Sequence, residues 1–183
     1  MYKFSKAQSG LTLLELSLAI GVISLIVAAS IAGYIAVQSG QRAVQSHQEL
    51  LSVRDKMKQL YASAGNFGGT DSSPVDQNSI FITASYLPAT LVISGSDILN
   101  SYGGNMNIMG GKTFFYVKVT EIPTAVCVDL MTDAIPSGWR AVQVGGTAPT
   151  SKPSQMSAVS AATAANSSNC SSADAVTMYF SAV

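Results

Sequence analysis

A long apolar segment near the N-terminus limits what this chain can fold into more than any other feature. From Leu11 to Val37 the sequence consists mainly of Leu, Ile, Val and Ala, and Glu15 is its only acidic or basic residue. A helix of this length, rising about 1.5 Å per residue, spans roughly 40 Å and can cross a bilayer. Lys3 and Lys6 precede it, and a positive flank stays on the cytoplasmic side. The segment is therefore expected to insert into a membrane.

Three fates are open for such a segment: an uncleaved anchor, an ordinary secretory signal, or a signal cut on the cytoplasmic side. Ser30, Ile31 and Ala32, followed by Gly33, offer the small residues that a signal peptidase favours. However, the run is longer than the apolar part of an ordinary signal, and a carboxylate inside it costs about 2.5 to 3.5 kcal/mol on insertion scales. Glu15 therefore needs a reason to lie there.

The residues around Glu15 supply that reason. Residues 9–15, SGLTLLE, resemble the processing site of type IV prepilins. The resemblance implies that a prepilin peptidase cuts after Gly10, that the new N-terminal residue Leu11 is methylated, and that Glu15 is the conserved glutamate of the family. A leucine in place of phenylalanine at the new N-terminus resembles the type IVb branch.

The resemblance also implies a role for the Glu15 carboxylate. In the family this glutamate attracts the N-terminal amine of a neighbouring subunit, so that adding a subunit neutralises two charges that are costly in an apolar environment. In this chain the amine would be that of Leu11. The alternative is a carboxylate that reaches the headgroup region from the end of the membrane segment.

Small residues recur every four positions along the same segment, which lets helices approach one another closely. They are Ala28, Ala32, Ala36 and Gly40, with Ala29 and Gly33 alongside. Such a stripe also arises by composition in an alanine-rich span. A helix-packing role between subunits is therefore a prediction that supports polymerisation without requiring it.

The helical pattern continues beyond the apolar segment, and no proline occurs before Pro74. Apolar and small residues at alternating spacings of three and four predict an amphipathic helix that packs against a sheet. They are Ala43, Ser46, Leu50, Val53, Met57, Leu60 and Ala64. Charged residues such as Glu49 and Arg54 are expected on the opposite face, and the glycines from Gly65 onward are expected to end the helix.

The second half of the chain predicts a small sheet and short helices. Strands are predicted at residues 112–121, 139–144 and 176–180. A short helix is predicted after Pro123, because five residues have helical spacing: Val126, Cys127, Leu130, Met131 and Ala134. Another helix is predicted over residues 158–165, leading to Cys170.

Residues 66–111 are interpreted as a long irregular connection with minor helix or strand. Within it, residues 100–104, NSYGG, resemble an Asn-x-aromatic-Gly-Gly motif of type IVb pilins. A glycine turn over a buried aromatic ring is the plain structural interpretation of the same residues.

Cys127 and Cys170 fit neither a C-x-x-C redox site nor a zinc pattern, because the only histidine, His47, is remote in sequence. A disulfide is the best use for them if the chain is exported, and it would contribute roughly 3 to 4 kcal/mol in the chain-entropy model. Two buried free thiols remain the alternative.

Together these patterns predict an α+β protein with a type IV pilin fold: a long N-terminal helix packed on a small antiparallel sheet, with a disulfide-closed C-terminal region. The predicted parts are a basic leader at residues 1–10, an apolar helix half at 11–40 and a globular head at 41–183. The implied function is that of a structural pilus subunit, made in the bacterial inner membrane and then extracellular.

The implied partners are other copies of the chain, the prepilin peptidase, an assembly ATPase with its membrane platform, and a secretin. In the family such pili serve adhesion, aggregation, motility or conjugative transfer. Charged residues make up only 11% of the chain and the net charge is zero, which argues against direct nucleic-acid binding. A secreted or anchored binding module, a minor pilin and a type II secretion pseudopilin are the alternatives.

An enzyme is not predicted, and no catalytic residue, metal or cofactor is assigned. His47 has no nucleophile motif near it, and Gly-x-Ser-x-Gly is absent. The carboxylates are few and scattered, so neither a two-acid hydrolase nor a metal site can be argued.

Overall fold

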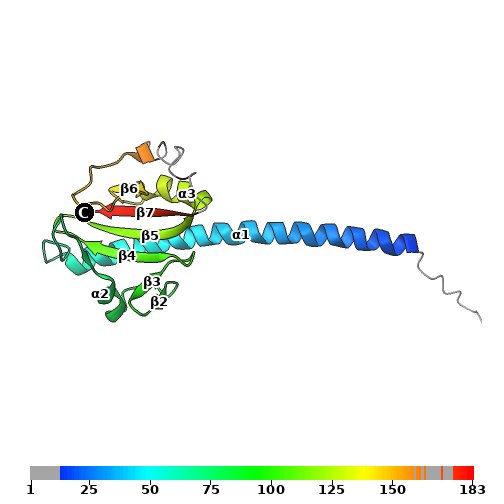
Figure 1. Ribbon diagram of the computed structural model, residues 1–183, viewed down its shortest axis with the longest axis horizontal. Coiled ribbons are helices and arrows are strands. Elements are labelled where there is room, and N and C mark those ends of the chain that lie inside the picture. Colours follow the sequence, from blue (N-terminus) through cyan, green and yellow to red (C-terminus); the bar gives the residue numbers. More distant parts are fainter. Residues whose placement is uncertain (1–12, 159, 162, 164–169, 171–174) are drawn as a thin grey trace, which may run out of the picture. The chain divides into compact units, whose positions relative to one another are not determined.

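The structure is a computed structural model that describes residues 13–183, except 159, 162, 164–169 and 171–174 (Figure 1). The chain divides into two compact units, one up to Gly40 and one from Gln41 to Val183, and each is described by itself. Gly10 and Leu11, the predicted cleavage and methylation residues, lie outside the described residues.

The first helix, α1, runs from Leu13 to Tyr61 without a break. It ends slightly before the predicted Ala64, and the following turn contains Gly65 and Gly68 in the left-handed region, with φ of 70° and 93°. A backbone of that kind favours glycine, so the glycines do follow the helix, as predicted.

The head contains one antiparallel sheet whose strands, within the described residues, follow the order β2-β3-β4-β5-β7-β6, with β1 pairing β4. Figure 1 shows the β2–β3 hairpin at one edge and β6 at the other. The strands are β1 (Val75–Asp76), β2 (Val92–Ser94), β3 (Asp97–Leu99), β4 (Asn105–Gly110), β5 (Phe115–Pro123), β6 (Ala141–Val144) and β7 (Ala175–Ala182). Two shorter helices are α2 (Asn78–Thr83) and α3 (Thr124–Ala134).

The main core lies between the second half of α1 and one face of the sheet. Leu50, Val53 and Met57 from α1 are fully buried in one cluster with the inward residues of β4, β5 and β7. Burying a side chain of this size stabilises the fold by about 1.5 to 3 kcal/mol. The predicted amphipathic stripe is therefore the face that holds the head on α1.

The three strands predicted in the second half correspond to β5, β6 and β7. Phe115, Val117 and Val119 alternate into the core, as predicted. The other face is not purely solvated, however, because Tyr116 and Tyr179 pack with Phe114 in a second, smaller cluster. The sheet thus carries a main core on one face and an aromatic patch on the other.

The interpretation of residues 66–111 as an irregular connection underestimated the sheet. β4 lies inside this stretch and pairs with β5 from Met106 to Gly110. Its alternate residues Met106 and Ile108 are fully buried. The connection therefore supplies a central strand as well as α2 and three short strands, β1 to β3.

The short helix α3 forms as predicted. It begins after Pro123, whose φ of −59° suits a helix start. The five residues with helical spacing are the ones it buries: Val126, Cys127, Leu130, Met131 and Ala134. Of the second predicted helix, Ala158, Ser160, Ala161 and Thr163 are helical, and the rest lies outside the described residues.

Candidate functional site

The apolar part of α1 presents its large side chains to the surroundings of the single chain. Leu13–Ile31 is long and apolar enough to cross a membrane. Leu13 is 87% exposed and Leu25 74%, and Leu14, Leu16, Leu18, Ile20, Val22, Ile23, Ile26, Val27 and Ile31 are also exposed. A predominantly apolar surface of this kind requires lipid or protein to cover it.

Three serine hydroxyls inside this segment are bonded to the helix itself. The Ser17, Ser24 and Ser30 hydroxyls donate to the carbonyls of Leu14, Ile20 and Ile26 at 2.8, 2.8 and 2.7 Å. A hydroxyl bonded in this way adds little cost in an apolar environment. The serines are therefore compatible with a buried or lipid-covered helix.

Glu15 lies in the first turn of α1 and is exposed. A carboxylate in a first turn interacts favourably with the positive end of the helix dipole. Its position places the only acidic group of the apolar segment at the N-terminal end of the described helix.

The predicted packing residues are partly described. Ala28, Ala29 and Gly33 are exposed in the single chain. A Cβ added at Gly33 would meet nothing within 4 Å, so no contact inside the chain requires glycine there. The side chains of Ala32 and Ala36 lie outside the described part of the chain.

Residues 100–104 form a tight turn between β3 and β4. The Asn100 side chain organises it: Oδ1 accepts from the backbone N–H groups of Tyr102 and Gly104 at 2.8 and 3.1 Å. Its Nδ2 donates to the Thr120 carbonyl at 2.8 Å, beside a bulge in β5. The motif therefore holds the β3–β4 turn against the bulge.

Gly104 is required by this close approach. A Cβ there would lie 2.1 Å from the Thr120 carbonyl oxygen and 2.7 Å from the Glu121 Cβ. Glu121 itself has φ of 59°, a conformation uncommon for a residue with a side chain. The turn and the bulge thus fit together only with glycine at position 104.

The structure predicts a large difference between the two glycines of this turn. Gly104→Ala should lower the free energy of unfolding by about 3 kcal/mol, because backbone must move to admit the methyl group. Gly103 has φ of 84° but open space for a Cβ, so Gly103→Ala should cost only about 1 kcal/mol. Urea unfolding of the detergent-solubilised protein measures both. Equal losses would contradict the close-packing account.

Glu49 was expected on the exposed face of the helix, and this expectation is wrong. The side chain is 1% exposed. Its Oε1 accepts from Ser101 Oγ at 2.8 Å and from Gln45 Nε2 at 3.0 Å. Because Ser101 belongs to the β3–β4 turn, Glu49 ties that turn to α1.

Tyr102 follows Ser101 and packs against the main core. Burial raises the pKa of its hydroxyl to about 12, with smaller and opposing influences from Arg42 and Glu49. The phenol is therefore neutral and remains a hydrogen-bond donor at physiological pH.

The loop after α3 is held to α1 by two further side chains. His47 Nε2 lies 3.0 Å from Ser137 Oγ, and Arg54 Nη1 donates to the Ser137 carbonyl. The Arg54 guanidinium also lies 5.9 Å from the centre of the Trp139 ring, within cation–π range. His47 therefore has a structural contact.

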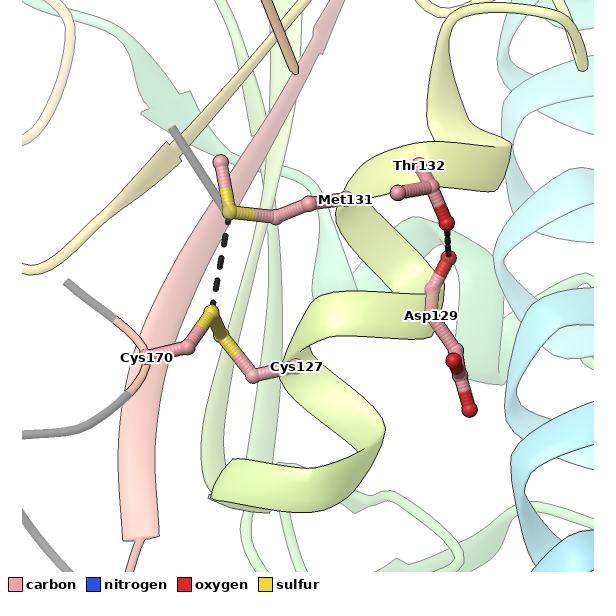
Figure 2. Close-up of a disulfide and its surroundings, with 5 residues drawn as sticks. All are labelled: Cys127, Asp129, Met131, Thr132 and Cys170. Atoms are coloured by element: carbon pink, nitrogen blue, oxygen red, sulfur yellow. Dashed lines mark hydrogen bonds between the residues drawn. A yellow bond between two sulfur atoms is a disulfide. The ribbon is translucent and has the colours of Figure 1, made fainter. Parts of the chain in front are cut away.

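Cys127 and Cys170 form a disulfide, as predicted, with their Cα atoms 5.8 Å apart. Both residues are buried, and Cys170 Sγ lies 3.7 Å from Met131 Sδ (Figure 2). The bond joins α3 to Cys170, which precedes β7 in the sequence. The loop that the bond closes contains β6.

No group of three or more metal-ligating side chains is found in the described residues. The Asp71 carboxylate instead makes hydrogen bonds between two loops. It accepts from the Lys112 and Thr113 N–H groups and from the Thr113 hydroxyl, each at 2.7 Å. These bonds, led by those from Thr113, hold the pKa of Asp71 below its usual range. Asp71 thus fastens the chain after α1 to the β4–β5 turn.

A long apolar N-terminal helix, an antiparallel sheet and a disulfide-closed C-terminal region together define a type IV pilin fold. A solved structure with this fold, TcpA, a type IV pilin from the Vibrio cholerae El Tor biotype, is similar at a TM-score of 0.53 and 16% identity. The match covers 78% of this chain and 99% of that one.

The family model described as PilS N terminal matches residues 40–182. This match spans most of the chain, which therefore belongs to that family and is a type IV pilin, a structural subunit of pili. A comparison with curated proteins finds no match.

Proposed function

We propose that the chain is a prepilin that inserts into the bacterial inner membrane, is cut between Gly10 and Leu11, and is methylated at Leu11. The mature subunit then polymerises through its N-terminal helix into an extracellular pilus. Adhesion, aggregation, motility and conjugative transfer are the uses proposed for that pilus.

The observation that carries this proposal is the exposed apolar surface of Leu13–Ile31. Lipid would cover it before assembly, and the same surface of other copies would cover it afterwards. The serine hydroxyls donate to carbonyls of their own helix, which suits both environments, since neither offers them water.

The small residues support the same assembly. Gly33 is not needed for packing within the chain, and Ala28 and Ala29 are exposed. Together with Ala32 and Ala36 they would let helices of neighbouring subunits pack closely in the filament core. Glu15 would pair with the Leu11 amine of a neighbour.

Processing and export imply partners outside this chain. A prepilin peptidase would cut and methylate it, and an assembly ATPase with its inner-membrane platform would add it to the filament. A secretin would let the filament leave the cell. The disulfide fits a head that folds in an oxidising compartment.

The intact mass and N-terminal peptide of protein recovered from cells that carry a prepilin peptidase test the proposal. We expect a chain that begins at Leu11 and carries one added methyl group. A matched Gly10→Val variant should keep its leader and begin at Met1, because a branched side chain blocks close approach of the main chain to the protease.

Other N-termini would overturn the proposal. A wild-type chain that begins at Gly33 would be an ordinary secreted domain. One that begins at Met1 in the presence of the peptidase would be a membrane-anchored module.

A further inference from the structure

Three buried oxygen atoms near the β3–β4 turn have no hydrogen-bond partner among the described residues. They are Ser46 Oγ, Glu49 Oε2 and Tyr102 Oη. The Ser46 side chain is fully buried and Glu49 is 1% exposed. Buried polar groups in folded proteins are nearly always paired with protein or with ordered water, so these three atoms require an explanation.

The three side chains come from two elements that are in contact, α1 and the β3–β4 turn. Ser46 and Glu49 are three residues apart on α1 and therefore lie on the same face of the helix. The other Glu49 oxygen, Oε1, accepts from Ser101, the residue directly before Tyr102. The Glu49 carboxylate is close enough to Tyr102 to act on its hydroxyl electrostatically.

Their hydrogen-bonding capacities are complementary to one small ligand. Glu49 Oε2 can only accept while the carboxylate is ionised, the neutral Tyr102 hydroxyl can donate, and the Ser46 hydroxyl can do either. A single water that accepts from Tyr102 and donates to Glu49 and Ser46 would satisfy all three. Three polar partners are also typical for a buried water.

We propose that Ser46, Glu49 and Tyr102 bind an internal water molecule that joins α1 to the β3–β4 turn. A divalent cation fits this group less well, because calcium takes six to eight oxygens and only one of these three is a carboxylate oxygen. The site lies within the head and does not depend on how the N-terminus is processed.

Thermal unfolding of the full-length protein in detergent, followed by near-ultraviolet circular dichroism of the head, tests the proposal. Tyr102→Phe and Ser46→Ala should each lower the Tm by about 2 to 4 °C, because each removes one of three partners of the water. The double variant should lose less than the sum of the two, since both act through the same water. Tyr86→Phe, at a half-buried ring over Lys56, is the control and should change little.

Three results would overturn the proposal. A raised or unchanged Tm for Tyr102→Phe would mean that its hydroxyl gains nothing from a ligand. Fully additive losses would mean that Tyr102 and Ser46 act separately. A Tm that rises with added calcium and falls with a chelator would assign the site to a cation.

A high-resolution structure of the assembled filament gives an independent test. We expect a density peak within hydrogen-bond distance of all three oxygens. Three oxygens that bond directly to one another, with no density peak between them, would refute the proposal of an internal water.

Discussion

Glu15→Ala should leave the precursor inserted and cleaved but should nearly abolish pili. The variant removes the only acidic group of the apolar segment and leaves the Leu11 amine of the neighbouring subunit without its proposed partner. Removing one member of a buried ion pair costs about 3 to 5 kcal/mol. This cost lowers the equilibrium constant for adding each subunit by at least about a hundredfold. Sheared surface pili, measured against total cleaved subunit in the membrane, report the loss.

Two matched variants separate charge from other effects at this position. Glu15→Gln keeps the size and hydrogen-bonding ability but not the charge, and should assemble as poorly as Glu15→Ala. Glu15→Asp keeps the charge on a shorter side chain and should assemble better than either. Normal pili from Glu15→Gln would refute the charge-pairing account, and a loss of cleavage would place the defect before assembly.

Removing the disulfide should produce the largest loss of stability in the head. The bond closes a loop with a sequence separation of 43 residues, for which the chain-entropy model gives about 4 kcal/mol. The paired change Cys127→Ser and Cys170→Ser avoids a lone reactive thiol. We expect its Tm to fall by about 10 °C, and its abundance in cells to fall with it.

The matched control is Met131→Leu, which keeps a similar volume beside the Cys170 sulfur. It should cost less than about 1.5 kcal/mol, because the covalent link stays intact. Treating the wild-type protein with a reductant should reproduce the double serine variant. An unchanged Tm after reduction would show that the link contributes little to the head.

The elements with a local pattern could be predicted from the sequence. α3 was predicted down to its five buried residues, because their spacings of one, three, one and three residues place them on one face of a helix. The core face of β5 followed from simple alternation of Phe115, Val117 and Val119. In both cases, a regular element with one buried face has apolar residues at regular spacings in the sequence.

Features that depend on a distant partner could not be predicted in this way. β4 has the sequence NMNIMG, in which only Met106 and Ile108 signal a buried face, and the asparagines and glycine are poor strand formers. Glu49 is buried because Ser101, 52 residues later, supplies a hydrogen bond. A charged residue in a helix gives no sign of such a partner.

The proposed packing of the N-terminal helix against other copies is a separate case. A Cβ added at Gly33 would meet nothing within 4 Å, and Ala28 and Ala29 are exposed in the single chain. The proposed packing between subunits would give the spacing of these residues a role that a single chain does not reveal.

The position of β7 has a consequence for the order in which the protein is made. Ala175–Ala182 is the last strand along the chain, yet it lies between β5 and β6. Until these residues have been synthesised, β5 and β6 share no neighbour and the sheet cannot be completed. The apolar part of α1, by contrast, precedes every strand along the chain and is therefore synthesised before them. If it inserts as proposed, membrane targeting precedes completion of the sheet, and the head is tethered to the bilayer until its final strand has been made.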